Sequence, residues 1–325
     1  MHKQRKGRAQ KRLEASQQKQ PRLGTIRYGI KPVEIISADQ LEQIHRRSLQ
    51  LLEELGIEFR DNVALQQWRD AGAEVNASRV RLPAELVESL LAHLPERFTL
   101  TGRGADTRFE LGVDTLAFCP AQGAPNIRDE NGIRRFSRQA DLRKLNRITQ
   151  MSPGFHMATG FACEPTDIAV PWRHLHINYS NLVDTDLAYF GLTTGQQRAE
   201  DSIAMARLVY GQEFMRNNAV MVGQISGNSP LVWDATMLEG LRVYAQANQV
   251  VLLSPFVLAA ANTPAHVIAT IVQVNAEALA GLAYAQLVKP GTKCIYGQYS
   301  VSVSMQTGAP MSGMPEVSLL NGIIG

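Results

Sequence analysis

Residues 219–256 read AVMVGQISGNSPLVWDATMLEGLRVYAQANQVVLLSPF, and they contain two short apolar runs separated by a helical stretch. The runs at 219–225 and 250–256 are almost wholly apolar, as expected for strands buried on both faces. The stretch between them, residues 234–247, has the length of an ordinary helix. A strand, a helix and a second strand in this order predict a βαβ unit of a parallel sheet.

The same alternation extends in both directions, from about residue 115 to the end of the chain. Each further apolar run ends in Gly, Ser, Pro, Asn or Thr, and a helical stretch follows it. The further runs are 115–120, 155–159, 187–192 and 294–299. The further helices are expected at 137–149, 170–182, 196–210 and 264–288, and another begins near Pro315. About six βα units are therefore predicted, and they suit either a doubly wound open sheet or an unfinished barrel.

Two observations favour the barrel. No Gly-x-Gly-x-x-Gly follows the first run, so the dinucleotide-binding reading lacks its fingerprint. The chain also stops inside the expected sixth helix, at residues 318–325, whereas a (β/α)8 barrel needs about two more units. The prediction is an α/β fold of the (β/α)8 TIM type, incomplete at its C-terminal end and covering residues 113–325.

Two other parts are expected before the barrel. Residues 1–31 carry ten Lys and Arg against one acid, Glu14, so residues 1–36 are predicted to be a basic disordered tail and linker. Residues 37–112 are predicted to be a small α+β segment. It opens with a helix capped by Ser37, which stands three residues before Gln40 in the spacing of a capping box.

Composition limits the function classes. Hydrophobic residues make up 45% and charged residues 19% of the 325, which is typical of a soluble globular protein. No run approaches 18 uninterrupted apolar residues, so no membrane span is predicted. A basic tail can contact nucleic acid or anionic lipid, but this one lacks interleaved aromatic residues, and we expect neither partner. Three cysteines without a C-x-x-C motif or an export signal favour the cytoplasm.

The carboxyl ends of the expected strands are where a barrel of this type places its active site. The side chains there are mostly neutral, with aromatic residues among them. Cationic methylammonium groups bind aromatic faces, so Phe256 and Tyr299 are candidate walls of a methylamine site, with ordinary core packing as the alternative. The candidate polar orienters are Gln122, Asn126, Ser226 and Asn228.

Acid–base and metal chemistry are less well supported. None of the six apolar runs contains the lysine that Schiff-base chemistry requires. Cys119, Cys163 and His156 could be considered as zinc ligands, but no short ligand spacing supports this, and we expect no metal site. Glu277, within a long apolar helix, is interpreted as a surface or helix-capping acid, and Glu316 as an acid in the first turn of the last helix.

A succession of short motifs carries a resemblance. Each is weak alone, but their order spans nearly the whole chain from about residue 30. The motifs are Ser37-Ala-Asp-Gln-Leu-Glu-Gln-Ile-His45, Leu52-Glu-Glu-Leu-Gly-Ile57, Gly123-Ala-Pro-Asn126, Asn228-Ser-Pro-Leu231, Met237-Leu-Glu-Gly240, Ser254-Pro-Phe256, Asn275-Ala-Glu-Ala-Leu-Ala-Gly281, Gln286-Leu-Val-Lys-Pro-Gly291, Thr307-Gly-Ala-Pro310 and Gly313-Met-Pro-Glu316. In this order they resemble the trimethylamine methyltransferase family.

The resemblance implies a methyltransferase that moves a methyl group from a methylated amine, such as trimethylamine or a betaine, to cobalt(I). The cobalt belongs to a small corrinoid protein that docks over the barrel mouth, so no cofactor is expected on the chain itself. Archaeal members carry pyrrolysine, which would fall beyond Gly325, and we expect the type without it. The alternative is an inactive truncated remnant that only binds a corrinoid protein. A homo-oligomer is possible in either case.

One departure from the family pattern concerns the segment after the sixth run. The family commonly has an acid and a basic residue there, whereas this chain has Ser304 and Gln306. A basic residue would suit the carboxylate of a betaine. Gln306 weakens the case for a betaine and leaves the substrate open. Gln306 is predicted to sense the polarity of the substrate, and Glu316 to orient the catalytic site from the start of its helix.

Overall fold

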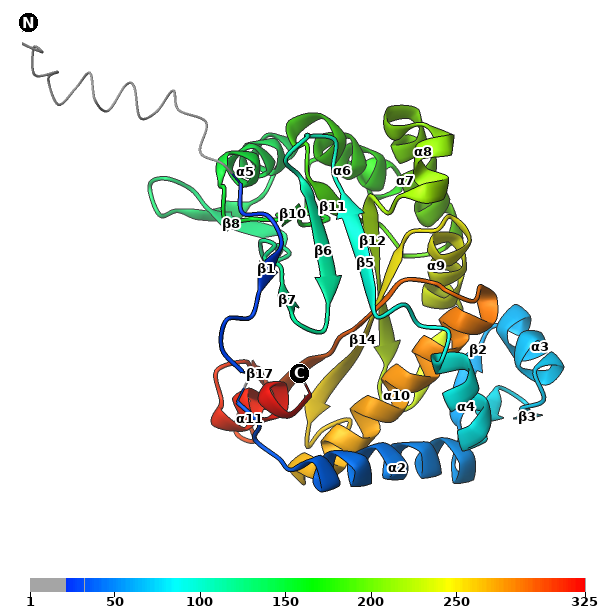
Figure 1. The fold of residues 1–325 in the computed structure, drawn as a ribbon. Helices are drawn as coiled ribbons and strands as arrows, with labels where there is room; N and C mark the ends of the chain where they lie inside the picture. The colour runs from blue at the N-terminus through cyan, green and yellow to red at the C-terminus, as the bar shows by residue number, and fades with distance from the viewer. Residues whose placement is uncertain (1–21, 32, 325) are drawn as a thin grey trace, which may run out of the picture.

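The computed structural model describes residues 22–31 and 33–324, and its centre is one curved, mostly parallel sheet (Figure 1). The strands lie in the order β10-β11-β12-β14-β16-β17, and β15 also pairs with β14. They are β10 (Met157–Ala158), β11 (Ala188–Gly191), β12 (Met221–Asn228), β14 (Val250–Ala259), β15 (Cys294–Tyr296), β16 (Tyr299–Val303) and β17 (Pro310–Met311).

Neighbouring strands in this sheet follow one another along the chain. The pairs from β10 to β16 are all parallel, and only β17 is antiparallel to its neighbour. A doubly wound sheet reverses its strand order at a switch point, and this sheet has no such reversal. The fold is thus mixed α/β with a sheet curled like half a barrel. The closure of a (β/α)8 barrel stays a prediction.

Helices cover the outer face of the sheet. Helix α9 packs on β12 and α10 on β14. The helices of this part are α5 (Gln139–Met151), α6 (Val170–Asp184), α7 (Gln196–Tyr210), α8 (Gln212–Asn217), α9 (Ala235–Gln246), α10 (Val267–Val288) and α11 (Pro315–Ile324). The six helices predicted in this region are confirmed to within a few residues, and α8 was not predicted.

The first predicted strand, at 115–120, is wrong in extent. Only β7 (Thr115–Leu116) forms there, and it pairs antiparallel with β1 (Ile26–Arg27). The following residues run beside β10 without forming a strand. The carbonyl of Phe118 accepts from the backbone N–H of His156 at 2.8 Å, and the N–H of Gly123 donates to the carbonyl of Phe161 at 2.9 Å.

The N-terminal part is joined to the part that carries the curved sheet through a second sheet, of order β13-β2-β4-β3. Its strand β13 (Val232–Asp234) comes from the loop after β12 and pairs parallel with β2. The expected division between 37–112 and 113–325 is therefore crossed by a shared sheet. The elements are α2 (Ala38–Glu54), β2 (Ile57–Arg60), α3 (Asn62–Asp70), β3 (Glu74–Asn76), β4 (Arg79–Arg81) and α4 (Ala84–Leu91). The capping box of Ser37 and Gln40 on α2 is confirmed.

A hairpin of β5 (Arg97–Thr101) and β6 (Arg108–Gly112) lies against the other face of the sheet (Figure 1). Leu100 and Phe109 from this hairpin are buried together with Phe190, Val222 and Val250. A bridge from Leu100 to Ala219 places the hairpin at the amino end of β12. The hairpin therefore seals the sheet at the end opposite to the carboxyl ends of its strands.

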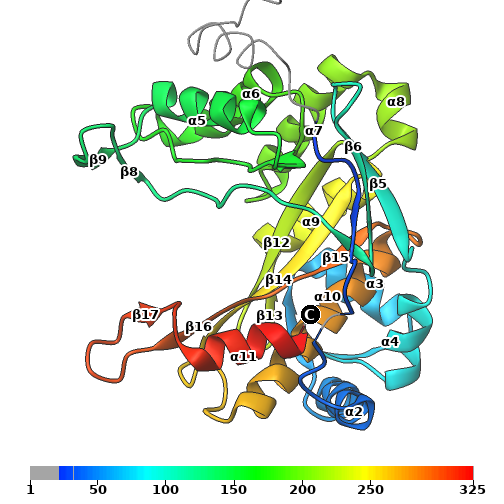
Figure 2. The same cartoon turned by 60° about the vertical axis from the view of Figure 1, so that its left-hand side comes forward.

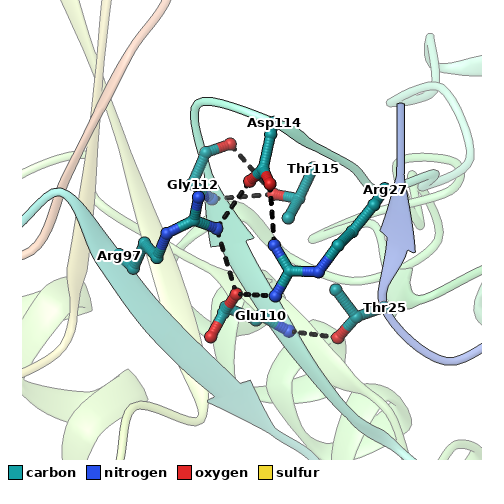
Figure 3. Close-up of polar contacts among 7 residues, drawn as sticks. All are labelled: Thr25, Arg27, Arg97, Glu110, Gly112, Asp114 and Thr115. Atoms are coloured by element: carbon teal, nitrogen blue, oxygen red, sulfur yellow. Dashed lines mark hydrogen bonds and ion pairs between the residues drawn. The ribbon is translucent and has the colours of Figure 1, made fainter. Parts of the chain in front are cut away.

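Figure 3 shows how β1 is attached to this hairpin. Arg27 contacts Glu110 at 2.7 Å and Asp114 at 2.8 Å, and Arg97 contacts the same two acids at 3.2 and 2.5 Å. The hydrogen bond from Arg97 lowers the pKa of Asp114 to about 2. Residues 1–21 lie outside the described residues. The rest of the expected tail and linker, however, contains a strand in contact with the folded body.

Helix α10 is long and apolar enough, by length and composition alone, to cross a membrane. Of its most apolar window, 72% is buried inside the protein. It packs against α2, α4 and β14. The central helix of a large core meets the same criterion, so this observation does not indicate a membrane span.

Candidate functional site

Five of the predicted site residues lie on or beside one face of the curved sheet. Side chains alternate between the two faces of a strand, so Val222, Gln224, Ser226 and Asn228 of β12 share a face. Val222 packs against the β5–β6 hairpin, whereas its neighbour Met221 packs with the core on the helix side. We call the face of Val222 the inner face. The register places Val250, Leu252, Ser254 and Phe256 of β14 on it, beside these four residues.

Phe256 and Tyr299 form the level of the inner face beside Asn228, the last residue of β12. They are register partners on β14 and β16, and their rings stack with centroids 5.4 Å apart and an interplanar angle of 11°. Phe256 is 42% exposed and Tyr299 is 53% exposed, so this pair is not ordinary core packing. Two exposed aromatic rings level with the carboxyl end of β12 can receive a cationic group.

Gln122 reaches the inner face from the segment beside β10. Its Nε2 donates to Oε1 of Gln224 at 2.8 Å. Gln224 is half-buried and was not predicted as a site residue, because it stands in the middle of an apolar run. Only the strict alternation of a strand, Val222-x-Gln224-x-Ser226, could have indicated that it shares a face with Ser226.

Asn228 ends β12, and its Nδ2 donates to Asp234. The loop after it is held by a buried acid. Glu277 accepts hydrogen bonds from the N–H of Leu231 at 2.8 Å, from Nε2 of Gln273 at 2.9 Å and from the hydroxyl of Ser229. Glu277 is only 1% exposed. Its interpretation as a surface or helix-capping acid is therefore wrong, because α10 is surrounded by protein and its one acid faces a polar loop.

Burial raises the pKa of the Glu277 carboxyl, and the hydrogen bonds from Leu231, Ser229 and Gln273 act in the opposite direction. A second side chain, Asn262, joins the ends of β12 and β14. Its Nδ2 donates to the carbonyl of Phe256 at 3.2 Å, and its Oδ1 accepts from the N–H of Leu258 at 2.7 Å. Glu277 and Asn262 thus position the strand ends that carry Asn228 and Phe256.

Three predicted site residues are not brought into this group. Asn126 starts β8 (Asn126–Arg128), which pairs with β9 (Arg134–Phe136) in a hairpin beside α5. That hairpin lies at the opposite edge of the sheet from β17 and α11 (Figure 2). Gln306 is exposed in the turn between β16 and β17, and Glu316 is exposed in the first turn of α11. Asn126 was misplaced because the chain leaves the sheet edge after Gly123. The catalytic roles of Gln306 and Glu316 stay predictions.

Two cavities lie away from the inner face. One of about 470 Å³ is bounded by α2, α10 and α11 and is mostly apolar. The other, of about 180 Å³, lies between α6, α7 and the loops after β10 and β11, where Nε2 of His174 donates to the carboxylate of Asp201 at 2.8 Å. Neither cavity is lined by a predicted site residue.

The histidine considered as a zinc ligand has a structural role. Nδ1 of His156 accepts from the N–H of Phe118 at 3.0 Å, and Nε2 lies 3.0 Å from the carbonyl of Gly24. Burial raises the pKa of both Cys119 and Cys163, which disfavours their thiolate forms. Among the residues that the structure describes, no group of three or more His, Cys, Asp or Glu side chains could hold a metal ion.

Comparison with known proteins assigns the family. The family model for trimethylamine methyltransferase matches residues 3–325. The chain belongs to the trimethylamine methyltransferase family. The resemblance predicted from the order of motifs is confirmed.

Several characterised members of the trimethylamine methyltransferase family are similar to this chain. The glycine betaine methyltransferase of Desulfitobacterium hafniense (strain Y51) is 36% identical over 286 residues, which cover 88% of this chain and 60% of that protein. The proline betaine:corrinoid methyltransferase of Eubacterium limosum is 24% identical, with the same two coverages. The trimethylamine methyltransferase MttB1 of Methanosarcina mazei is also 24% identical, again with these coverages. The chain thus spans about 60% of the length of these relatives.

A solved structure shares the fold. The protein in the crystal structure of the hydroxylamine MtmB complex superposes with a TM-score of 0.58 at 12% identity, over 90% of this chain and 59% of that chain. At this identity the likeness concerns the fold alone.

Proposed function

We propose that this protein transfers a methyl group from a methylated amine to the cobalt(I) of a small corrinoid protein. Family membership supports methyl transfer, and the relative at 36% identity acts on glycine betaine. The proline betaine relative is named as a corrinoid methyltransferase. A betaine is therefore a better first candidate than trimethylamine.

The observation that carries the proposal is the stacked pair of Phe256 on β14 and Tyr299 on β16, level with the carboxyl end of β12. An ammonium group on an aromatic face gains roughly 0.5–2 kcal/mol, more when it is desolvated. The side chains beside the pair on the inner face are Asn228, Ser226 and Ser254, all neutral. Such surroundings suit a cation that needs no proton transfer.

The chemistry follows from this placement. As the methyl carbon bonds to cobalt, its bond to nitrogen breaks and the bonding electrons stay on nitrogen. A quaternary ammonium leaves as a neutral tertiary amine, so no general acid is required. What the chain must supply is position: the methyl carbon has to lie in line with the cobalt, with water excluded. Phe256 and Tyr299 would hold the ammonium, and Gln122 would orient the site through Gln224.

The side from which the partner would approach follows from the fold. The β5–β6 hairpin seals the amino end of the sheet, so the corrinoid protein would approach from the carboxyl ends, where Phe256 and Tyr299 are exposed. We propose that the sheet is part of the wall of a (β/α)8 barrel whose mouth lies at this end.

The proposal is tested by following the absorbance of cobalt(I) in reduced free cobalamin and in a reduced corrinoid protein after adding glycine betaine, proline betaine or trimethylamine. Conversion to methyl-cobalt with one amine is the expected result, with a betaine favoured. A folded protein that converts none of the three amines with either acceptor contradicts the proposal.

A further inference from the structure

The inner face changes in polarity along the strands. The register of β12 and β14 divides it into levels, and neighbouring levels are two residues apart, or about 6.6 Å along a strand. The lowest level, Val222 with Val250, is apolar and sealed by the β5–β6 hairpin. Amide and hydroxyl groups follow, from Gln224, Ser226 and Ser254. The aromatic pair of Phe256 and Tyr299 comes next, one level before Leu258 and Val301.

The polar levels have donors without partners. Within residues 22–31 and 33–324, no protein group bonds the hydroxyls of Ser226 and Ser254 or Nε2 of Gln224. Ser254 is only 3% exposed as a residue, but its hydroxyl is not among the fully buried polar atoms without a partner, so the hydroxyl itself stays accessible from the inner face. Oε1 of Gln224 already accepts from Gln122, so the free end of this amide is its N–H₂ group.

Three neutral donors below two aromatic rings match a molecule with an anionic and a cationic end. We infer that Gln224, Ser226 and Ser254 receive the carboxylate of a zwitterionic quaternary amine whose methylammonium group lies at Phe256 and Tyr299. This inference rests on the proposed function, and it deepens it by selecting a betaine and by fixing its orientation. Gln224 and Ser254 are then specificity-determining residues.

The orientation agrees with the reaction. The methylammonium end lies nearer the carboxyl ends of the strands, where the corrinoid protein would approach. The carboxylate points toward the sealed end of the sheet. The two-residue step between the serine level and the aromatic level, about 6.6 Å along a strand, suits a short zwitterion. No basic residue at position 306 is needed, because neutral donors bind the carboxylate.

The most direct variant is Gln224→Glu, which is nearly isosteric and can still accept from Gln122. It places a negative charge beside the substrate carboxylate. The probes are glycine betaine and tetramethylammonium, which share the methylated cation and differ in the carboxylate. At pH 8, we expect affinity for glycine betaine to fall at least about tenfold. Affinity for tetramethylammonium is expected to stay within about twofold or to rise.

A second variant removes a donor without adding charge. Ser254→Ala should lower the affinity for glycine betaine about threefold to tenfold and leave the affinity for tetramethylammonium unchanged. Ser300→Ala is the matched control. Ser300 is also a buried strand serine, but its register partner is Val257, on the opposite face from Ser254. It should change neither affinity.

Calorimetric titration of the wild type and the three variants decides the inference without using catalysis. The expected result is a selective loss of affinity for glycine betaine in Gln224→Glu and Ser254→Ala, and no change in Ser300→Ala. Any of three results would overturn the inference. The first is an equal loss of affinity for both probes, and the second is no loss of affinity in Gln224→Glu. The third is a wild type that binds glycine betaine no more tightly than tetramethylammonium. Selective loss in a protein that transfers no methyl group would support the carboxylate site while contradicting the proposed function.

Discussion

At the scale of single residues, the proposed binding site for the ammonium group depends on two exposed aromatic rings. Removing either ring should weaken binding of tetramethylammonium by roughly 0.5–2 kcal/mol, because the ammonium loses one aromatic face. Phe256→Ala and Tyr299→Ala are therefore expected to raise its dissociation constant, whereas Phe214→Ala, in another exposed aromatic pair on the outer helices, should not. Titration calorimetry measures all three. Equal effects in all three variants would mean that the stacked pair does not bind the cation.

Glu277 is the second residue with a measurable consequence. Three donors converge on its carboxyl group, so Glu277→Gln replaces one acceptor by a donor and should lower the free energy of unfolding by about 1–3 kcal/mol. Urea unfolding of the two proteins gives this difference. A Gln variant as stable as the wild type would show that the loop after β12 does not depend on this acid.

The pKa of Glu277 also predicts a pH dependence. Its folded pKa is raised above the ordinary 4.5, so between these two values the folded state binds more protons than the unfolded state. The contribution of this group to stability is therefore fully present below pH 4.5 and is lost as the pH rises through the folded pKa. The stability advantage of the wild type over Glu277→Gln should shrink with rising pH across that window. Urea unfolding at several pH values measures it, and an advantage that grows with pH would contradict this assignment.

At the scale of elements, close packing between β12 and α9 explains a glycine in the strand. A Cβ added at Gly223 would lie 2.7 Å from the Tyr244 ring, which is fully buried. Gly223→Ala should therefore cost about 1–3 kcal/mol of stability. Gly154→Ala is the control, since nothing lies within 4 Å of its added Cβ. Thermal unfolding compares the two, and equal stabilities would contradict the packing described.

Most elements could be predicted from the chain itself, and the exceptions have physical causes. Helix α7 and the capping box of α2 depend on local spacing, which is visible in the sequence. Strand β13 is three residues long, and its partner β2 lies about 170 residues earlier, so no local pattern reveals it. Glu277 was misinterpreted because an apolar helix does not show which side its single acid faces. Asn126 was misplaced because apolar residues along a sheet edge need not form a strand.

At the scale of the whole molecule, the parts have separate tasks. The β5–β6 hairpin seals the amino end of the curved sheet, the helices cover its outer face, and the inner face exposes aromatic rings level with the carboxyl end of β12. In the proposed reaction, a methylated amine held there would have its methyl groups directed to where the corrinoid protein approaches.

Methyl transfer from a betaine to cobalt can be followed with glycine betaine labelled with ¹³C in its N-methyl groups. The protein is mixed with it and with reduced free cobalamin, and NMR quantifies both products. The account predicts equal amounts of dimethylglycine and ¹³C-methyl-cobalt, both abolished when the protein is omitted. Dimethylglycine without methyl-cobalt, or neither product from the folded protein, would contradict the claim.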